Sequence, residues 1–154
     1  MQADPTSPFR TFKDLEVYQV AREFRQKMYQ LSHRLPEFEK YALATQIRRA
    51  AVSVTNNIAE GHGRYHYLDQ VKFLLQARGS VEELLDDLTV CADERYAPDS
   101  DSSDLESLGW RLHQLINGYG RYLRRRKAAD SAQLHEPSPP YSAGDDDPFG
   151  EDPL

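Results

Sequence analysis

The chain has 154 residues, of which 39% are hydrophobic and 29% charged, and this balance is typical of a single soluble domain with its own core. No run approaches the roughly 18 apolar residues of a membrane span. The N-terminus also lacks the basic and apolar regions of a signal peptide. The single cysteine, Cys91, excludes a disulfide framework. We therefore expect a cytoplasmic protein.

The net charge of −6 is unevenly distributed along the chain. Residues 128–154 contain seven acidic side chains and no lysine or arginine. Residues 1–127 contain 19 basic and 18 acidic side chains, so this part is close to neutral. Electrostatic attraction to a partner must therefore come from local patches rather than from the overall charge.

Apolar residues at spacings of three and four predict two helices in the first part of the chain. The first covers residues 12–35, and Pro36 ends it. Its apolar stripe is Val17, Ala21, Phe24, Met28, Leu31 and Leu35. The second covers residues 39–60, with a stripe of Leu43, Ile47, Ala50, Ala51, Val54 and Ile58. Gly61 and Gly63 follow it, and we interpret them as the turn into the next helix.

Two further helices are expected in the second part of the chain. The third covers residues 67–94 and is apolar over a wide arc that includes Cys91. Its predicted solvent face is acidic, with Glu82, Glu83, Asp86, Asp87, Asp93 and Glu94. After a loop at residues 97–102, Ser103 and Glu106 have the spacing of a capping box that starts the fourth helix. The fourth stripe is Leu105, Leu108, Leu112, Leu115, Tyr119 and Tyr122, and the helix is expected to end at Lys127.

These elements predict an all-α fold. No stretch alternates with the period of two that a strand requires. Short connections make consecutive helices antiparallel neighbours, so we expect an antiparallel up-down-up-down four-helix bundle. The expected organisation is a flexible N-terminus at 1–11, the bundle at 12–127 and a disordered acidic C-terminal tail at 128–154.

Several runs of sequence, read together, are specific to one family. They are residues 12–18 (FKDLEVY), 46–54 (QIRRAAVSV), 57–64 (NIAEGHGR), 73–74 (FL) and 79–84 (GSVEEL). This set resembles the four-helix-bundle family of 23S rRNA intervening-sequence proteins, which is similar to the accessory subunits of diversity-generating retroelement reverse transcriptases. The resemblance implies a bacterial or phage cytoplasmic protein that assembles into a ring-like homopentamer. The retroelement relatives act with a reverse transcriptase and nucleic acid.

The second predicted helix carries a polar face opposite its apolar stripe. Arg49, Ser53, Asn56 and Glu60 fall within a narrow arc, with Asn57 and Arg64 at its edge. We favour a polar network that fixes one arrangement of helices or subunits, and leave a functional site, either a subunit contact or an anion-binding patch, as the alternative. Gly79 lies in the middle of the third helix, where glycine is unfavourable, and this indicates a close helix–helix or subunit approach.

The fourth helix ends in the one dense cationic cluster of the sequence. Its members are Arg121, Arg124, Arg125, Arg126 and Lys127. Phosphate binding is the functional interpretation, and a solvated helix terminus is the structural one. Arg48, Arg49 and Arg64 are the other candidates for contacting nucleic acid.

Motifs for catalysis, metals or cofactors are absent from the sequence, and we expect neither enzyme activity nor a cofactor. The leading hypothesis is a homo-oligomeric scaffold that acts with RNA, DNA or a nucleic-acid enzyme. The alternative is a protein-interaction adaptor that uses the acidic third helix and the tail. The tail itself could solubilise the protein, dock on a partner, or fold back over the cationic cluster.

Overall fold

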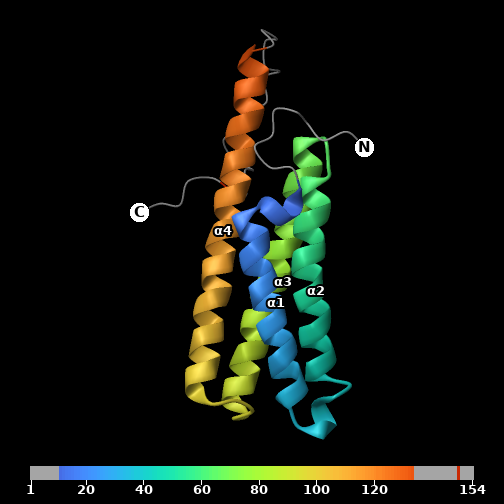
Figure 1. Cartoon of the computed structure of the whole chain (residues 1–154), viewed down its shortest axis with the longest axis vertical. Coiled ribbons are helices and arrows are strands. Elements are labelled where there is room, and N and C mark those ends of the chain that lie inside the picture. Colours follow the sequence, from blue (N-terminus) through green and yellow to red (C-terminus); the bar gives the residue numbers. More distant parts are fainter. Residues whose placement is uncertain (1–10, 134–148, 150–154) are drawn as a thin grey trace.

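The computed structural model describes residues 11–133 and Phe149, and everything below concerns this part of the chain. It contains four long helices and no strand: α1 (Glu16–Arg34), α2 (Leu43–His62), α3 (Tyr67–Asp93) and α4 (Asp99–Gln133). The helices run side by side along one axis, with consecutive helices antiparallel (Figure 1). Each helix packs on its neighbours in sequence, and α4 closes the bundle on α1. The predicted antiparallel four-helix bundle is confirmed.

The first two helices begin later than the sequence indicated, because each is preceded by a short 3-10 turn. Phe12–Asp14 forms the first turn (η1), which Thr11 and Asp14 cap reciprocally. Glu37–Glu39 forms the second turn (η2), and its last carboxylate accepts a bond from the amide of Leu43, 3.2 Å away. The predicted starts at residues 12 and 39 therefore belong to these turns, whereas the expected stop before Pro36 is confirmed.

The predicted limits of the fourth helix were wrong at both ends. α4 begins at Asp99, so Ser103 lies inside the helix and the expected capping box is not formed. The amides of Asp101 and Ser102 donate to the carbonyl of Pro98, and acidic residues in the first turn suit the positive end of the helix dipole. At the other end α4 continues six residues past Lys127, into the segment expected to be disordered. The rest of that segment, apart from Phe149, lies outside the described residues, as does the expected flexible N-terminus before Thr11.

The core consists of the predicted stripes of α1, α2 and α3, and Cys91 is fully buried among them as expected. The stripe of α4 is displaced from the prediction. Ile116 and Leu123 are buried, whereas Leu108, Leu115, Tyr119 and Tyr122 are only partly buried. Two glycines share the buried face of α4: Gly109 and Gly120. Glycine does not contribute to an apolar stripe in the sequence, so the predicted stripe of α4 included residues beside the buried face instead of Gly109 and Gly120.

Three glycines in or next to α2 and α3, Gly61, Gly63 and Gly79, have different structural roles. Gly61 lies within α2, where a Cβ would come 3.1 Å from the Cβ of Phe73, so close packing on α3 requires it. Gly63 ends the helix with φ of −78°, an ordinary helical value. Around Gly79, by contrast, a Cβ would find nothing within 4 Å, so a close approach inside the chain does not explain it.

One residue assigned to the acidic solvent face of α3 is instead buried. Asp87 is only 5% exposed, and its Oδ2 has no hydrogen-bond partner among the described residues. Burial, with Glu83 and Asp86 adding repulsion, raises its pKa to about 6. The acidic face of α3 is therefore smaller than predicted.

Candidate functional site

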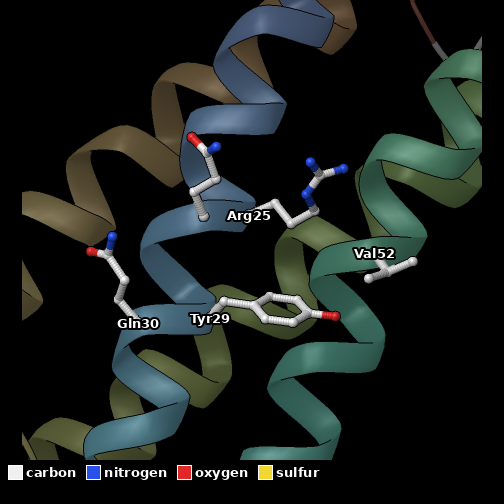
Figure 2. Close-up of a pocket in the computed structure, with 5 residues that line it drawn as sticks. Arg25, Tyr29, Gln30 and Val52 are labelled. Atoms are coloured by element: carbon white, nitrogen blue, oxygen red, sulfur yellow. The ribbon is translucent and has the colours of Figure 1, made fainter.

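A shallow groove runs between α1 and α2 on the outside of the bundle. Its α1 wall consists of Arg25, Gln26, Tyr29 and Gln30, and its α2 wall of Arg48, Arg49, Val52, Ser53, Asn56 and Asn57. We call this set the α1/α2 groove. Figure 2 shows Arg25 and Tyr29 pointing from α1 towards α2, with Val52 on the facing helix. The spacing of the α1 residues at i and i+4 places both side chains on one face of that helix.

The lining of the α1/α2 groove carries positive charge and no carboxylate. Its cations are Arg25, Arg48 and Arg49. Arg25 donates to the hydroxyl of Thr55 at 2.9 Å, which holds its guanidinium between the two helices. Arg48 donates to the hydroxyl of Thr45 at 3.3 Å. The groove can therefore accept an anionic group or a carboxylate-bearing surface.

The predicted polar network exists at the edge of this groove, with a smaller membership than expected. The hydroxyls of Ser53 and Ser80 are 2.8 Å apart and link α2 to α3. Asn57 donates to the carbonyl and the hydroxyl of Ser53. Asn56 lies beside them on the exposed surface, in the lining of the groove. The bond between Ser53 and Ser80 therefore links α2 to α3 within one chain.

Glu60 and Arg64 form a separate pair at the end of α2. Arg64 donates to the Glu60 carboxylate and lies over the ring of Phe73, 4.7 Å from its centroid. The carbonyl of Arg64 accepts from the side-chain amide of Gln70 at 2.8 Å. Neither Glu60 nor Arg64 lines the groove, so the predicted arc divides into two regions.

The cationic cluster occupies the far part of α4, and aromatic rings support several of its members. Arg126 lies over the ring of Tyr122, and Lys127 lies 4.8 Å from the ring centroid of Tyr67 at the start of α3. The rings of Tyr119 and Tyr122 are stacked with centroids 6.0 Å apart. Burial raises the pKa of Tyr119 to about 12, so its hydroxyl remains neutral. Arg121 and Arg124 are half-buried, whereas Arg125 and Lys127 are exposed.

We call this region, comprising Arg64, Tyr67 and residues 121–127, the cationic end. The antiparallel arrangement places the end of α2, the start of α3 and the far part of α4 together (Figure 1). The opposite end of the bundle has a net negative charge, because six acidic side chains outnumber Arg34, Lys40 and Arg95 there: Glu37, Glu39, Asp93, Glu94, Asp99 and Asp101. The cationic end keeps an excess of positive charge although Glu60, Asp69 and Asp130 lie near it. A nearly neutral domain is therefore polarised along its axis, and a polyanion would be attracted to one end of it.

The structure divides the sequence-predicted nucleic-acid candidates between two places. Arg48 and Arg49 lie in the α1/α2 groove, whereas Arg64 joins the five C-terminal cations at the cationic end. Sequence reasoning missed Arg25 and Tyr29, because their pattern marked them only as the solvent side of α1. It also missed Tyr67, whose ring contacts the cationic cluster across helices.

Other chemistry finds little support in the described residues. They contain no group of three or more His, Cys, Asp or Glu that could hold a metal ion. Burial and nearby carboxylates raise the pKa of Cys91 to about 11, which makes its thiol a poor nucleophile. No described helix is long and apolar enough to cross a membrane.

Comparison with known proteins identifies the family of this fold. A comparison with curated proteins finds no significant match. The family model for the 23S rRNA-intervening sequence protein matches residues 13–118, which is more than half of the chain. The match spans α1, α2, α3 and α4 as far as Gly118, and it ends before the cationic cluster begins at Arg121. The chain therefore belongs to the family of 23S rRNA-intervening sequence proteins.

Proposed function

We propose that this protein is a non-enzymatic scaffold that assembles into a ring-like homopentamer and contacts nucleic acid through its cationic end. In this role it acts beside a nucleic-acid enzyme, of which a reverse transcriptase is the specific candidate. The observation that carries the proposal is the concentration of cations and tyrosines at one end of a bundle whose other end is acidic.

The chemistry of the cationic end suits a phosphate backbone. Lysine and arginine that neutralise phosphates release condensed counterions, which gives affinity without sequence selectivity. Aromatic rings beside the cations, such as Tyr67 and Tyr122, offer surfaces on which bases can stack. In a ring of subunits the cationic end would be repeated around one axis. Several weak contacts would then act together and strengthen binding to a long polyanion.

The α1/α2 groove supports the assembly part of the proposal. Tyr29 and Val52 give it apolar surface, and the arginines beside them suit a partner surface that carries carboxylates. The exposed part of α3 offers such a surface, with Glu82, Glu83 and Asp86. Gly79 is exposed on the same helix, next to Ser80, whose hydroxyl reaches the groove edge at Ser53. A neighbouring subunit at this position would give Gly79 the close approach that it lacks inside the chain.

Nucleic-acid binding is tested by fluorescence anisotropy with a labelled single-stranded RNA over a series of salt concentrations. The full chain is compared with the triple variant Arg124→Gln/Arg125→Gln/Lys127→Gln. The variant should bind more weakly, and the slope of log Kd against log salt should fall by about two, because each lost phosphate contact contributes about 0.7.

The matched control removes three exposed cations elsewhere, in Arg22→Gln/Lys27→Gln/Arg111→Gln. The control should retain most of the RNA affinity and the slope. Equal losses in both triple variants would show that the cationic end is not a specific surface. An absence of RNA and DNA binding at low salt in every variant would leave the protein-interaction adaptor as the better hypothesis. Native mass spectrometry tests the ring independently, and a monomer alone would contradict it.

A further inference from the structure

Phe149 is the one described residue beyond the end of α4, and it is packed into the bundle. Its side chain is only 1% exposed and belongs to the same core cluster as the helix interiors. Burying an aromatic ring removes a large apolar area from water. A residue from a segment rich in aspartate and proline is thus fixed on the body of the protein.

The seat of this ring is a position on α4 that only glycine can fill. A Cβ at Gly120 would overlap three ring carbons of Phe149. A Cβ at Gly118, two residues earlier, would meet only an Nη of Arg121 at 3.8 Å, which is an ordinary van der Waals contact. Glycine in a helix interior costs about 1 kcal/mol relative to alanine. Contact with Phe149 supplies the physical reason for that cost at Gly120.

The neighbouring helix completes the pocket with a cation. The guanidinium of Arg78, on α3, lies over the ring of Phe149 at 5.6 Å from its centroid. Arg78 also donates to the Oδ1 of Asn117 at 3.0 Å, which orients it against α4. A cation over an aromatic face is attracted by the ring quadrupole. The pocket therefore recognises an aromatic ring, and its charge favours a ring that is flanked by carboxylates.

The length of the connecting chain suits docking within one subunit. Gly120 and Gln133 are 13 residues apart on α4, or about 20 Å at 1.5 Å per residue. Phe149 follows Gln133 by 16 residues, and a chain of that length can span at most roughly 53–58 Å. The connection is therefore long enough for Phe149 to reach Gly120 of its own chain.

The sequence around Phe149 carries charge of the sign opposite to the surface beside its seat. Five carboxylates lie within four positions of it: Asp145, Asp146, Asp147, Glu151 and Asp152. On α4, Arg124 and Lys127 follow Gly120 at i+4 and i+7, so they share its face of the helix. A bound Phe149 therefore tethers a dense negative charge close to the cationic end.

We infer that the pocket formed by Gly120, Arg78 and Asn117 is a docking site for the chain's own Phe149, and that docking places the acidic segment in competition with nucleic acid at the cationic end. The regulatory half of this inference rests on the proposed function. The docking half stands on the burial of Phe149 and on the shape of its seat. In this proposal, Phe149 and the carboxylates around it act as an intramolecular ligand of the bundle.

Docking is tested without nucleic acid, by comparing amide chemical shifts of the full chain and its variants in ¹H–¹⁵N NMR spectra. Phe149→Ala should shift the amides of α4 around Gly120 and of α3 around Arg78. Gly120→Ala should produce the same pattern, because its Cβ closes the seat while alanine strengthens the helix. Gly118→Ala is the matched control and should change only its immediate neighbours. Confinement of the Phe149→Ala shifts to the tail would overturn the docking site.

Competition is tested by RNA binding of the same proteins at about 0.1 M salt. Phe149→Ala and Gly120→Ala should each bind RNA about five- to 25-fold more tightly, as expected if one or two phosphate contacts are regained. Gly118→Ala should bind like the parent protein. Unchanged RNA affinity after release of Phe149 would overturn the competition while the docking site stands. If no variant binds RNA, the proposed nucleic-acid function fails, and the NMR result still decides the docking site.

Discussion

Replacing Asp87 by asparagine tests whether a buried charge destabilises this bundle. Asp87 is 5% exposed, its Oδ2 has no partner among the described residues, and its pKa is raised from 3.8 to about 6 by burial and by Glu83 and Asp86. A pKa difference of about two corresponds to roughly 3 kcal/mol of destabilisation at pH 7. The amide of asparagine would itself lack a partner, at about 1–3 kcal/mol. The expected net gain for Asp87→Asn at pH 7 is therefore about 1 kcal/mol.

The sign of the pH dependence follows from the raised pKa. Between pH 3.8 and about 6 the folded protein holds this proton more tightly than the unfolded chain does. The Asp87 contribution to stability therefore decreases as pH rises through that window, and it is constant above it. Asp87→Asn should remove this contribution, so its advantage over the parent protein should grow from pH 4 to pH 7.

Urea denaturation followed by circular dichroism at several pH values measures both quantities. The matched control is Asp93→Asn, an exposed aspartate on α3 that is not among the groups raising the Asp87 pKa, which should change stability by no more than about 0.5 kcal/mol. A constant stability difference between Asp87→Asn and the parent protein from pH 4 to pH 7 would refute the linkage. Loss of stability at pH 7 would refute the claim that the buried carboxylate is unfavourable.

Three further changes probe the packing and the assembly. Gly109→Ala should lower the free energy of unfolding by about 1–3 kcal/mol, because its Cβ would meet side chains of α1 and α3 at 2.7–3.1 Å. Gly79→Ala has open space for its Cβ, so in a monomer it should leave the free energy of unfolding unchanged or raise it by up to about 1 kcal/mol. Equal effects of the two substitutions would contradict the packing argument. Val52→Glu should dissociate the proposed oligomer in sedimentation experiments, whereas the exposed Gln114→Glu on α4 should not. The thiol of Cys91 should react with Ellman's reagent only as fast as the protein opens, and rapid labelling of the native protein would show that the core is open there.

The sequence was sufficient for the number and order of the helices and for the packing faces of α1, α2 and α3, because long amphipathic stripes carry a strong periodic signal. It was insufficient where the cause of a structure lies between elements. At the start of α4 the amides of Asp101 and Ser102 donate to the carbonyl of Pro98, and Asp101 pairs with Arg34 of α1 at 3.1 Å. The local sequence instead shows a capping-box pattern four residues later, at Ser103 and Glu106. Asp87 looked like one of several surface acids, since nothing in its local sequence reveals that it turns inward.

The candidate site shows the same division. The cationic cluster could be recognised in the sequence because its members are nearly consecutive. Tyr67 contacts it only because the antiparallel arrangement brings the start of α3 beside the far part of α4. Arg25 and Tyr29 belong to a groove that exists only because α1 and α2 pack side by side (Figure 2). Phe149 is 29 residues from Gly120 in sequence, and neither residue type alone indicates the contact.

Packing inside the chain explains some of the glycines within the described helices but not all of them. Gly61, Gly109 and Gly120 each face an atom that a Cβ would crowd, so their helical cost is offset by packing inside the chain. Gly79 meets nothing within 4 Å, and yet it has the same cost. Gly118 is not crowded either, since its Cβ would meet only an arginine Nη at 3.8 Å, so contact of Gly79 with a second subunit rests on the proposed assembly and not on a rule for all helical glycines. The family match at residues 13–118 includes Gly79 and Gly118, whereas Gly120 and Phe149 lie outside it.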